Sequence, residues 1–407
     1  MAAMTTTERV LLGPAAGDVL AAVLEPAGLR VERWGRDAVH ARPGAETSVG
    51  YVVGTRPAGA PAAEPVTHHL TVTTADVDGP GVARVRVGDA ALAVWAHPDD
   101  PALPALRTAS TPDLLAGVLA GAGDATRVTA LRTVAYRPLR RAVLAAGTDT
   151  GDRWAKVLRA DRSTGLVTRL ALLRGVDVPV PATVAHTPGL VVLGSAAGRP
   201  LADHLMAGDA PHPGAVLELL SRVAAVPADA LPARPPWSAR LEQYVAALVD
   251  HAPDLADVVR WTADAVHAAV AVTDPGPAGV THGDLHPANL WWDGATGLGL
   301  VDVDTLGPGL LVDDLACLLA HTSVLPTLDP GYRAVPGWRD ALLREADRVV
   351  DPVGLRARAA AVLLSLAASR PAEHLVRAWA LLARDLVPRP VRGVPVPAPG
   401  TTERRAS

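Results

Sequence analysis

One segment of the sequence concentrates polar groups that bind metal ions and accept protons. From Val280 it reads Val-Thr-His-Gly-Asp-Leu-His-Pro-Ala-Asn, so Asp284 and Asn289 bracket a short loop between apolar runs. A second apolar run, 298–301, is followed by Asp302. Amide and carboxylate oxygens are ligands that Mg²⁺ accepts, and a carboxylate can take the proton of an attacking hydroxyl. These residue types at this spacing indicate phosphoryl transfer, which needs both.

The composition supplies a cation for the same chemistry. The chain has 38 Lys and Arg residues, and Lys156 is the one lysine among them. Arg and Lys differ in shape, hydration and pKa range, so a lone lysine marks a position that Arg does not serve. We expect Lys156 to hold nucleotide phosphates, with Asp284 as the acid–base group and Asn289 and Asp302 as magnesium ligands. Asn289 is likewise the one Asn of the chain.

Two predicted regions must position these residues. The first has five short strands and one helix, and Lys156 lies on its third strand. Its expected strands are 127–136, 140–146, 153–158, 183–186 and 190–193, and its helix is 163–173. The second region is mostly helical, with a break at 279–304 that contains the polar loop. The small-residue connector 194–200 joins them.

The whole chain divides into four predicted parts. Residues 1–125 form an α+β domain without a readable role, and 126–197 form the small lobe. Residues 198–387 form the helical lobe with the polar loop. Residues 388–407 are rich in Pro, Gly and Arg, which predicts a disordered tail.

The polar loop and its surroundings resemble a known family. The segments His282–Asn289, Leu300–Asp304 and Asp314–Ala316 are similar to motifs of the aminoglycoside phosphotransferase family, which includes choline kinase-like and maltokinase-like enzymes. The resemblance covers about 126–387. It implies an α+β, bilobal protein kinase-like fold, here preceded by an extra α+β domain similar to that of maltokinase-like members.

The resemblance also implies a set of roles. Asp284 would be the catalytic base, Asn289 and Asp302 would bind Mg²⁺, and Lys156 would contact the α- and β-phosphates of ATP. The implied activity moves the γ-phosphoryl group to a hydroxyl of a small molecule of aminoglycoside, sugar or amino-alcohol type. The sequence leaves the acceptor open, and also leaves open whether the donor is ATP or GTP.

Other residues near the loop have a structural and a functional interpretation. We expect His282 to fix the loop through hydrogen bonds, and His286 to line the substrate site or support the loop. Asp304 is a second metal ligand, a substrate contact or neither. Asp314 is expected to cap a helix that starts at Leu315. Cys317 is expected to pack in the core, and His321 is expected to pack or to form a hydrogen bond.

Two features depart from the kinase-like pattern. The predicted helix 163–173 has no acidic residue to pair with Lys156, and the first hairpin has no G-x-G-x-x-G sequence. Arg140 and Arg141 lie in that hairpin turn, where they either donate hydrogen bonds to phosphates or form a solvated basic turn. These departures favour a second hypothesis, a nucleotide-binding pseudokinase without chemistry.

A third hypothesis is a metal-dependent hydrolase. It would use His282, Asp284 and His286 with Asp302 and His321, because imidazole and carboxylate groups bind transition metals. It gives no role to Lys156 or Asn289. We therefore place it behind the phosphotransferase and the pseudokinase.

Composition excludes several classes. The 407 residues carry 38 basic and 42 acidic side chains, a net charge of −4, so no basic excess exists to bind nucleic acid. One cysteine excludes a disulfide scaffold. No secretory signal and no membrane-spanning apolar run are expected, which predicts a cytoplasmic protein with no membrane partner.

Overall fold

The computed structural model describes residues 6–40, 46–60, 62–88, 90–369 and 372–387. The predicted tail 388–407 lies outside these residues. The chain forms two compact units, Met1–Ala171 with Val180–Ala196, and Leu172–Pro179 with Ala197–Ser407. Each unit is described by itself.

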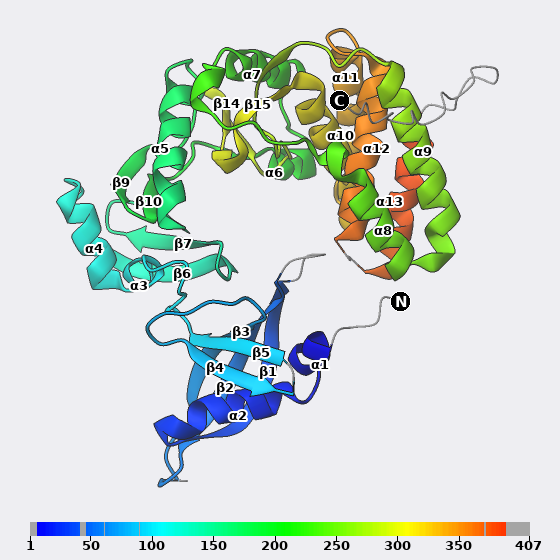
Figure 1. Cartoon of the computed structure of the whole chain (residues 1–407). Helices are drawn as coiled ribbons and strands as arrows, with labels where there is room; N and C mark the ends of the chain where they lie inside the picture. Colours follow the sequence, from blue (N-terminus) through cyan, green and yellow to red (C-terminus); the bar gives the residue numbers. More distant parts are fainter. Residues whose placement is uncertain (1–5, 41–45, 61, 89, 370–371, 388–407) are drawn as a thin grey trace, which may run out of the picture. The chain divides into compact units, whose positions relative to one another are not determined.

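The first unit begins with a five-stranded antiparallel sheet and two helices (Figure 1). The strand order is β1 (Leu29–His40), β2 (Ser48–Pro57), β3 (Val66–Thr73), β5 (Ala90–Ala96) and β4 (Ala83–Val87). Helices α1 (Thr6–Leu12) and α2 (Ala16–Leu24) precede the sheet. Leu20 of α2 is buried in one apolar core with Val49 and Tyr51 of β2, which removes apolar surface from water.

Strand β1 is an element that the sequence patterns did not predict. Its pairing with β2 shifts register between Val31 and Arg33 and again between Arg36 and Ala38. Each irregularity breaks the strict alternation of apolar and polar residues on which strand prediction rests. The strand is therefore 12 residues long without the usual sequence signal.

A second antiparallel sheet follows in the same unit. Its order is β6 (Val128–Arg137), β7 (Arg141–Thr148), β8 (Arg153–Leu158), β10 (Leu190–Gly194) and β9 (Thr183–Thr187). Three helices accompany it: α3 (Leu106–Ala109), α4 (Pro112–Gly121) and α5 (Ala160–Arg174). Leu106 and Leu119 share a buried core with Leu144 and Val157, so α3 and α4 pack on this second sheet. The sequence interpretation grouped both helices with residues 1–125.

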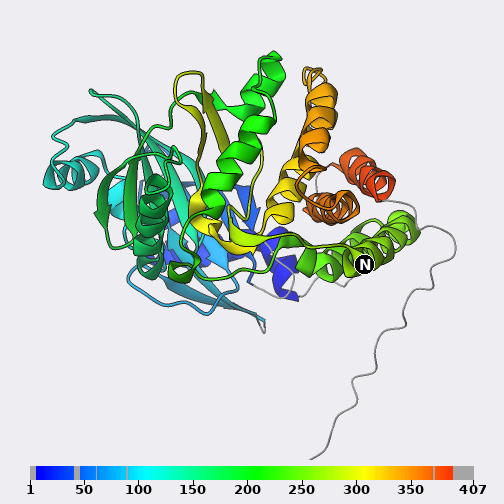
Figure 2. The same ribbon diagram turned by 90° about the horizontal axis from the view of Figure 1, so that it is seen from above.

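The second unit is mostly helical, with short strands that carry its loops. Its helices are α6 (Leu201–Ala207), α7 (Gly214–Ala224), α8 (Leu241–His251), α9 (Ala256–Val272), α10 (Leu311–Leu328), α11 (Val335–Ala346), α12 (Pro352–Ala368) and α13 (Glu373–Leu386). Its strands are β11 (Arg199–Pro200), β12 (Ala278–Thr281), β13 (Leu290–Asp293), β14 (Gly297–Leu300) and β15 (Gly307–Leu310). Short 3₁₀ turns complete the chain: η1 (Glu25–Ala27), η2 (Ala228–Ala230), η3 (Trp237–Arg240), η4 (Pro253–Leu255) and η5 (Val303–Thr305). Figures 1 and 2 show α8, α9, α12 and α13 side by side.

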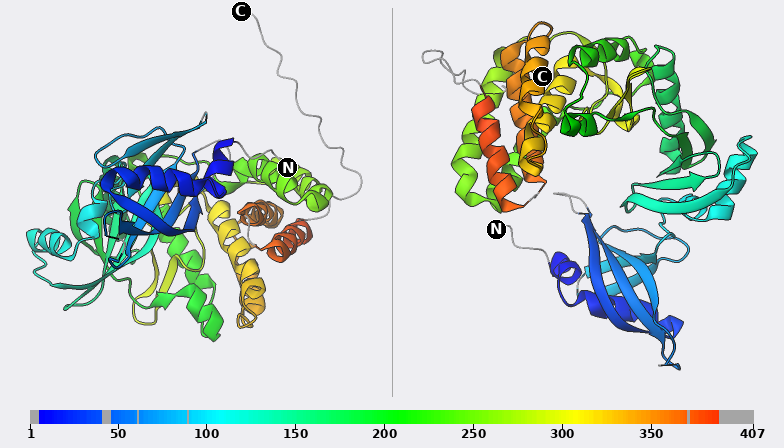
Figure 3. Two further views of the ribbon diagram at one scale, coloured as in Figure 1. Left: turned by 90° about the horizontal axis from the view of Figure 1, so that it is seen from below. Right: turned by 180° about the vertical axis from the view of Figure 1, so that it is seen from behind.

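Helix α10 lies in the core of this unit and supports the polar loop. Within the described part of the chain, it is the one helix of at least 18 residues that is apolar enough to cross a membrane. The helix is not one uninterrupted apolar run, because its first turn carries Asp313 and Asp314, and 61% of it is buried inside the unit. Helix α10 packs against α12 and α11, which accounts for its apolar composition; Figure 3 shows these neighbouring helices in yellow to orange.

The arrangement confirms the predicted α+β fold class. A β-rich lobe precedes a helical lobe, and an additional α+β domain precedes both. Gly198, in the predicted connector, has φ +80°. A Cβ atom there would lie 2.0 Å from the carbonyl oxygen of Trp292. The pairing of β11 with β13 therefore requires glycine at this position.

Candidate active site

The polar loop connects β12 to a β-hairpin, and the register of the hairpin places two of the predicted ligands. Leu290 of β13 pairs with Leu300 of β14. The Val301 N–H donates a hydrogen bond of 3.0 Å to the Asn289 carbonyl, so the ladder continues one step further. Asn289 comes directly before the hairpin, and Asp302 comes shortly after it. The two residues therefore lie at the same end of the hairpin.

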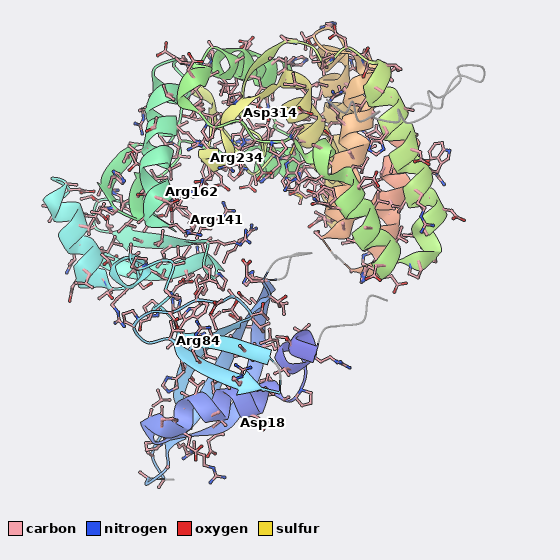
Figure 4. All side chains as sticks on the ribbon, in the orientation of Figure 1. Asp18, Arg84, Arg141, Arg162, Arg234 and Asp314 are labelled. Carbon is pink, nitrogen blue, oxygen red and sulfur yellow. The ribbon has the colours of Figure 1, made fainter. Side chains whose placement is uncertain are left out.

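The side chain of Asp314 holds the backbone of the polar loop in place. Its carboxylate accepts hydrogen bonds from the His282 N–H at 2.7 Å and the Gly283 N–H at 2.8 Å. Burial raises the pKa of the Asp314 carboxyl, and His282 and the two backbone donors oppose that rise. Figure 4 labels Asp314 among the elements around β14, β15 and α10.

This placement corrects the sequence interpretation of Asp314. The expectation was a cap of a helix beginning at Leu315, but α10 begins at Leu311 and the capping position is Leu310. Asp314 is inside the first turn and 1% exposed. Its two backbone partners lie about 30 residues earlier in the chain, a contact that no local pattern predicts.

His282 links three parts of the loop and is fully buried. Its Nδ1 accepts a hydrogen bond from the Asp284 N–H at 3.3 Å, so Nε2 carries the proton and donates to the Val301 carbonyl at 3.0 Å. Its own carbonyl accepts the Thr305 hydroxyl at 2.7 Å. Because both ring nitrogens are engaged, His282 is not a metal ligand in this arrangement, and the hydrolase hypothesis loses one of its ligands.

The turn at Gly283 leaves the Asp284 carboxylate exposed to the site. Gly283 has φ +78°, and a Cβ atom there would lie 3.0 Å from the Thr305 carbonyl oxygen. Within the described residues, the Asp284 side chain has no hydrogen-bond or ion-pair partner, and it is partly exposed. A carboxylate in this state can accept a proton from a bound hydroxyl group.

Asn289 has the properties of a ligand for a hard cation. Its side chain is 5% exposed, and its Nδ2 donates to the Asp284 carbonyl at 3.0 Å. Its Oδ1 has no donor in the part of the chain that the structure describes, and an amide oxygen without a donor is available to Mg²⁺. Asp302 has φ +53°, which is uncommon for a residue other than glycine and costs about 1–3 kcal/mol. The last acidic candidate, Asp304, lies in η5.

The rings of two histidines near Asp284 pack against each other. The rings of His286 and His321 are 5.0 Å apart between centroids. Burial lowers the pKa of both imidazoles, and the pKa of His321 falls to about 3. Both rings are therefore uncharged at neutral pH.

The cluster around Asp284 also contains the single cysteine. The ligand atoms of Asp284, Cys317 and His321 lie within 4.8 Å of one another. Burial raises the pKa of the Cys317 thiol well above its usual value, and the Asp284 and Asp314 carboxylates add to this rise. The sequence interpretation assigned core packing to Cys317 and packing or a hydrogen bond to His321, although their spacing of four residues already predicted a shared helix face.

Lys156, Arg140 and Arg141 belong to the first unit. Lys156 lies on β8 between β7 and β10, opposite Val143 and Val191, and its side chain is 6% exposed. Arg141 begins β7 and is labelled in Figure 4. Arg140 forms an ion pair of 2.9 Å with Glu46.

The turn that carries these arginines is held by a residue of the N-terminal region. Asp100 is 2% exposed, and its Oδ2 accepts hydrogen bonds from the Leu139 N–H and the Tyr136 hydroxyl, both at 2.8 Å. Leu139 has φ +62°. Burial raises the pKa of Asp100, and its hydrogen-bond donors oppose the rise. No local pattern predicts this contact, because Asp100 and Leu139 lie 39 positions apart.

Helix α5 is longer than predicted and includes an acidic residue. It spans Ala160–Arg174, so Asp161 is in its first turn. The Asp161 side chain is 63% exposed and lies 3.3 Å from the Arg162 guanidinium. The buried charged side chain of this helix is Arg169, at 7% exposed. The segment 163–173 has no acidic residue, as the sequence indicated.

Part of the chain, including this site, matches a known protein family. Residues 156–350 match the phosphotransferase enzyme family. The matched region begins at Lys156 and includes Asp284, Asn289, Asp302 and Asp314. No curated protein matches the sequence.

Several solved structures are similar. One is a choline/ethanolamine kinase family protein from Mesorhizobium loti, with 19% identity and a TM-score of 0.46, covering 70% of this chain and 93% of that one. Another is a macrolide 2′-phosphotransferase from Brachybacterium faecium, with 20% identity and a TM-score of 0.40, covering 65% and 96%. A third is an amicoumacin kinase in complex with AMP-PNP, Ca²⁺ and Ami, with 13% identity and a TM-score of 0.42, covering 63% and 90%.

Proposed function

We propose that the chain is a small-molecule kinase that transfers the γ-phosphoryl group of ATP to a hydroxyl group in the presence of Mg²⁺. The observation that carries the proposal is the Asp284 carboxylate. It has no partner among the described side chains, and the loop that bears it is tied to Asp314, Thr305 and Val301. The match of residues 156–350 to the phosphotransferase enzyme family supports it.

Each residue has one task in the proposed reaction. Asp284 accepts the proton of the acceptor hydroxyl as its oxygen forms a bond to the γ-phosphorus, and ADP leaves with the electrons of the broken P–O bond. Asn289 and Asp302 would hold Mg²⁺, which when bound neutralises charge on the phosphate oxygens. Lys156 holds the α- and β-phosphates. Most of the acceleration comes from positioning and charge stabilisation.

The two arginines of the β6–β7 turn belong to the phosphate side of the site in this proposal. Arg141 is placed at the start of β7 and donates hydrogen bonds to the phosphates. Arg140 does so only after leaving Glu46. His282 keeps its structural task, because both of its nitrogens are engaged within the loop. His286 and Asp304 belong to the acceptor side of the site.

The proposed acceptor is a small molecule with a free hydroxyl, of aminoglycoside, sugar or amino-alcohol type. The test is a screen of such compounds with the full chain, ATP and Mg²⁺, in which the product is detected by the mass of one added phosphate. We expect a phosphorylated product that requires both ATP and the divalent cation. Replacing ATP by GTP in the same screen identifies the donor.

A pseudokinase is the second candidate, and two observations favour it. The acidic residue of α5 is exposed, and Arg140 is engaged by Glu46. A pseudokinase binds nucleotide but yields no product with any acceptor. Calorimetric binding of ATP together with a failed screen, and with no release of ADP above background, would favour it over the kinase.

A further inference from the structure

Asp284 lies in a cluster with Cys317 and His321. The proposed reaction uses Asp284 but neither of the other two residues. Phosphoryl transfer requires the carboxylate but gives no task to a thiol or to a second imidazole. The three side chains nevertheless bring one carboxylate oxygen, one sulfur and one ring nitrogen within 4.8 Å of one another. These are three ligand types that zinc binds in proteins.

Helix α10 explains why the three groups meet. Asp314, Cys317 and His321 are three and four positions apart, so they lie along one face of the helix. Asp314 binds the backbone of residues 282 and 283 at the N-terminal end of that face. The next loop residue, Asp284, therefore meets the side chains one and two turns further along α10. The anchor of the loop and the two other ligands are parts of the same rigid element.

Core packing accounts for Cys317, which is 1% exposed, but it does not account for His321. The His321 side chain is partly exposed, and neither of its nitrogens has a hydrogen-bond partner among the residues that the structure describes. Its ring contact is with His286. An imidazole nitrogen without a protein partner is available to a ligand. The Asp284 carboxylate at the other side of the cluster is also without a partner.

The geometry requires a small adjustment. In a tetrahedral zinc site with Zn–S near 2.3 Å and Zn–N and Zn–O near 2.0–2.1 Å, ligand atoms are about 3.3–3.6 Å apart. Side-chain rotation of Asp284 and His321 can close the remaining gap, because no hydrogen bond restrains either group. The fourth position is left to water.

We propose that Asp284, Cys317 and His321 form a site for a thiophilic divalent cation, with Zn²⁺ as its type. Mg²⁺ does not compete for it, because a hard cation prefers oxygen ligands and keeps its waters. Binding deprotonates the Cys317 thiol, and the proton is released to solvent. An occupied site holds the Asp284 carboxylate and so blocks phosphoryl transfer. This last consequence rests on the proposed function, whereas the binding itself does not.

The first experiment uses Co²⁺ as a spectroscopic substitute for Zn²⁺. A thiolate bound to Co²⁺ gives a near-ultraviolet charge-transfer band, and the chain has one cysteine, so the band reports on Cys317 alone. We expect the band to appear on titration of the metal-free full chain and to disappear when Zn²⁺ is added. H321A should weaken Co²⁺ binding at least about tenfold. The matched control is H267A, since His267 is a partly exposed histidine beside Glu242.

The second experiment measures inhibition of the phosphotransferase reaction by buffered Zn²⁺ at constant Mg²⁺. For C317A and H321A, each compared with its own rate without zinc, the inhibitory concentration should rise at least about tenfold, and for H267A it should stay at the wild-type value. Circular dichroism verifies that each variant is folded. If excess Co²⁺ gives no charge-transfer band with the wild-type chain, the site does not exist. A band without any turnover by the wild-type chain would leave the site standing and remove the proposed function.

Discussion

Two buried carboxylates hold two loops in this molecule, and they do so in different ways. Asp314 accepts two backbone N–H groups of the polar loop, and Asp100 accepts one backbone N–H and one hydroxyl from the β6–β7 turn. Burial raises the pKa of both carboxyls. Asp314 lies inside the family region 156–350, whereas Asp100 lies before it.

The difference concerns where the supporting residues come from. The polar loop is supported by residues of its own unit that follow it in the sequence, namely Val301, Thr305 and Asp314. The β6–β7 turn is supported by the N-terminal region, through Asp100 and Glu46. A turn without a glycine-rich sequence can thus be held by contacts from a distant part of the chain. We infer that residues before the family region take part in shaping the proposed nucleotide site.

The largest effect is expected from removing the anchor of the polar loop. D314A leaves the His282 and Gly283 N–H groups buried without an acceptor, at about 1–3 kcal/mol each. The free energy of unfolding should fall by about 2–5 kcal/mol, and kcat should fall at least about a hundredfold in the folded fraction. Urea denaturation and initial rates measure the two effects. The control is D340N, whose aspartate is 57% exposed, and equal behaviour of the two variants would contradict the anchor.

A smaller and different effect is expected from the other anchor. D100A removes the acceptor of the Leu139 N–H and the Tyr136 hydroxyl. Because the turn is proposed to cover the phosphates, KM for ATP should rise about tenfold, equivalent to about 1.4 kcal/mol, while kcat changes little. Steady-state kinetics at saturating acceptor measure the split. D99N is the neighbouring control, because Asp99 pairs with Arg107 away from the turn. A fall in kcat with unchanged KM would place Asp100 outside the nucleotide site.

The helix that supports the polar loop also carries a half-buried carboxyl, that of Asp313, which makes a pH prediction possible. Burial raises the pKa of Asp313 to about 6, against the opposing effect of Arg358 at 3.2 Å. The folded state therefore binds more protons than the unfolded state between pH 4 and 6, and stability contributed by Asp313 is lost as pH rises through this range. The loss is about 2–3 kcal/mol.

D313N lacks this titration. Urea denaturation between pH 4 and pH 7 should show the stability of the wild-type chain falling relative to D313N as pH rises. A difference between the two chains that is constant over this range would show that the pKa of Asp313 is not raised.

The smallest effect is expected at the rim of the turn. Arg140 and Glu46 are 39% and 30% exposed, and a pair at that exposure contributes at most about 1 kcal/mol. E46Q should leave the free energy of unfolding within this limit. It releases Arg140 toward the phosphates, so KM for ATP should fall about twofold. A rise in KM would show instead that the ion pair itself holds the turn in its binding conformation.

The sequence predicted the parts of the site whose chemistry is local. Asp284, Asn289 and Asp302 lie within one stretch with a recognisable spacing, and the hairpin between them follows from two apolar runs. The resemblance to the phosphotransferase family rests on the same stretch. Strand β8 was also predicted with the bounds that the structure has.

The sequence did not predict contacts between distant residues. Asp314 has the pattern of a helix cap, because helix starts favour Asp, yet its partners are two backbone groups of another element. Asp100 lies in a region with no motif, and Cys317 meets Asp284 only because Asp314 docks the loop on α10. Strand β1 was not predicted because its register irregularities interrupt the alternation of apolar and polar residues.

Replacing Asp284 tests the central claim most directly. D284N keeps the shape of the side chain but cannot accept the proton of the acceptor hydroxyl. With Mg²⁺, ATP and an acceptor found in the screen, phosphorylation should fall about a hundredfold to ten-thousandfold, while the Kd for ATP measured by calorimetry stays near that of the wild-type chain. Phosphorylation at the wild-type rate by D284N would contradict the assignment of the base and, with it, the proposed mechanism.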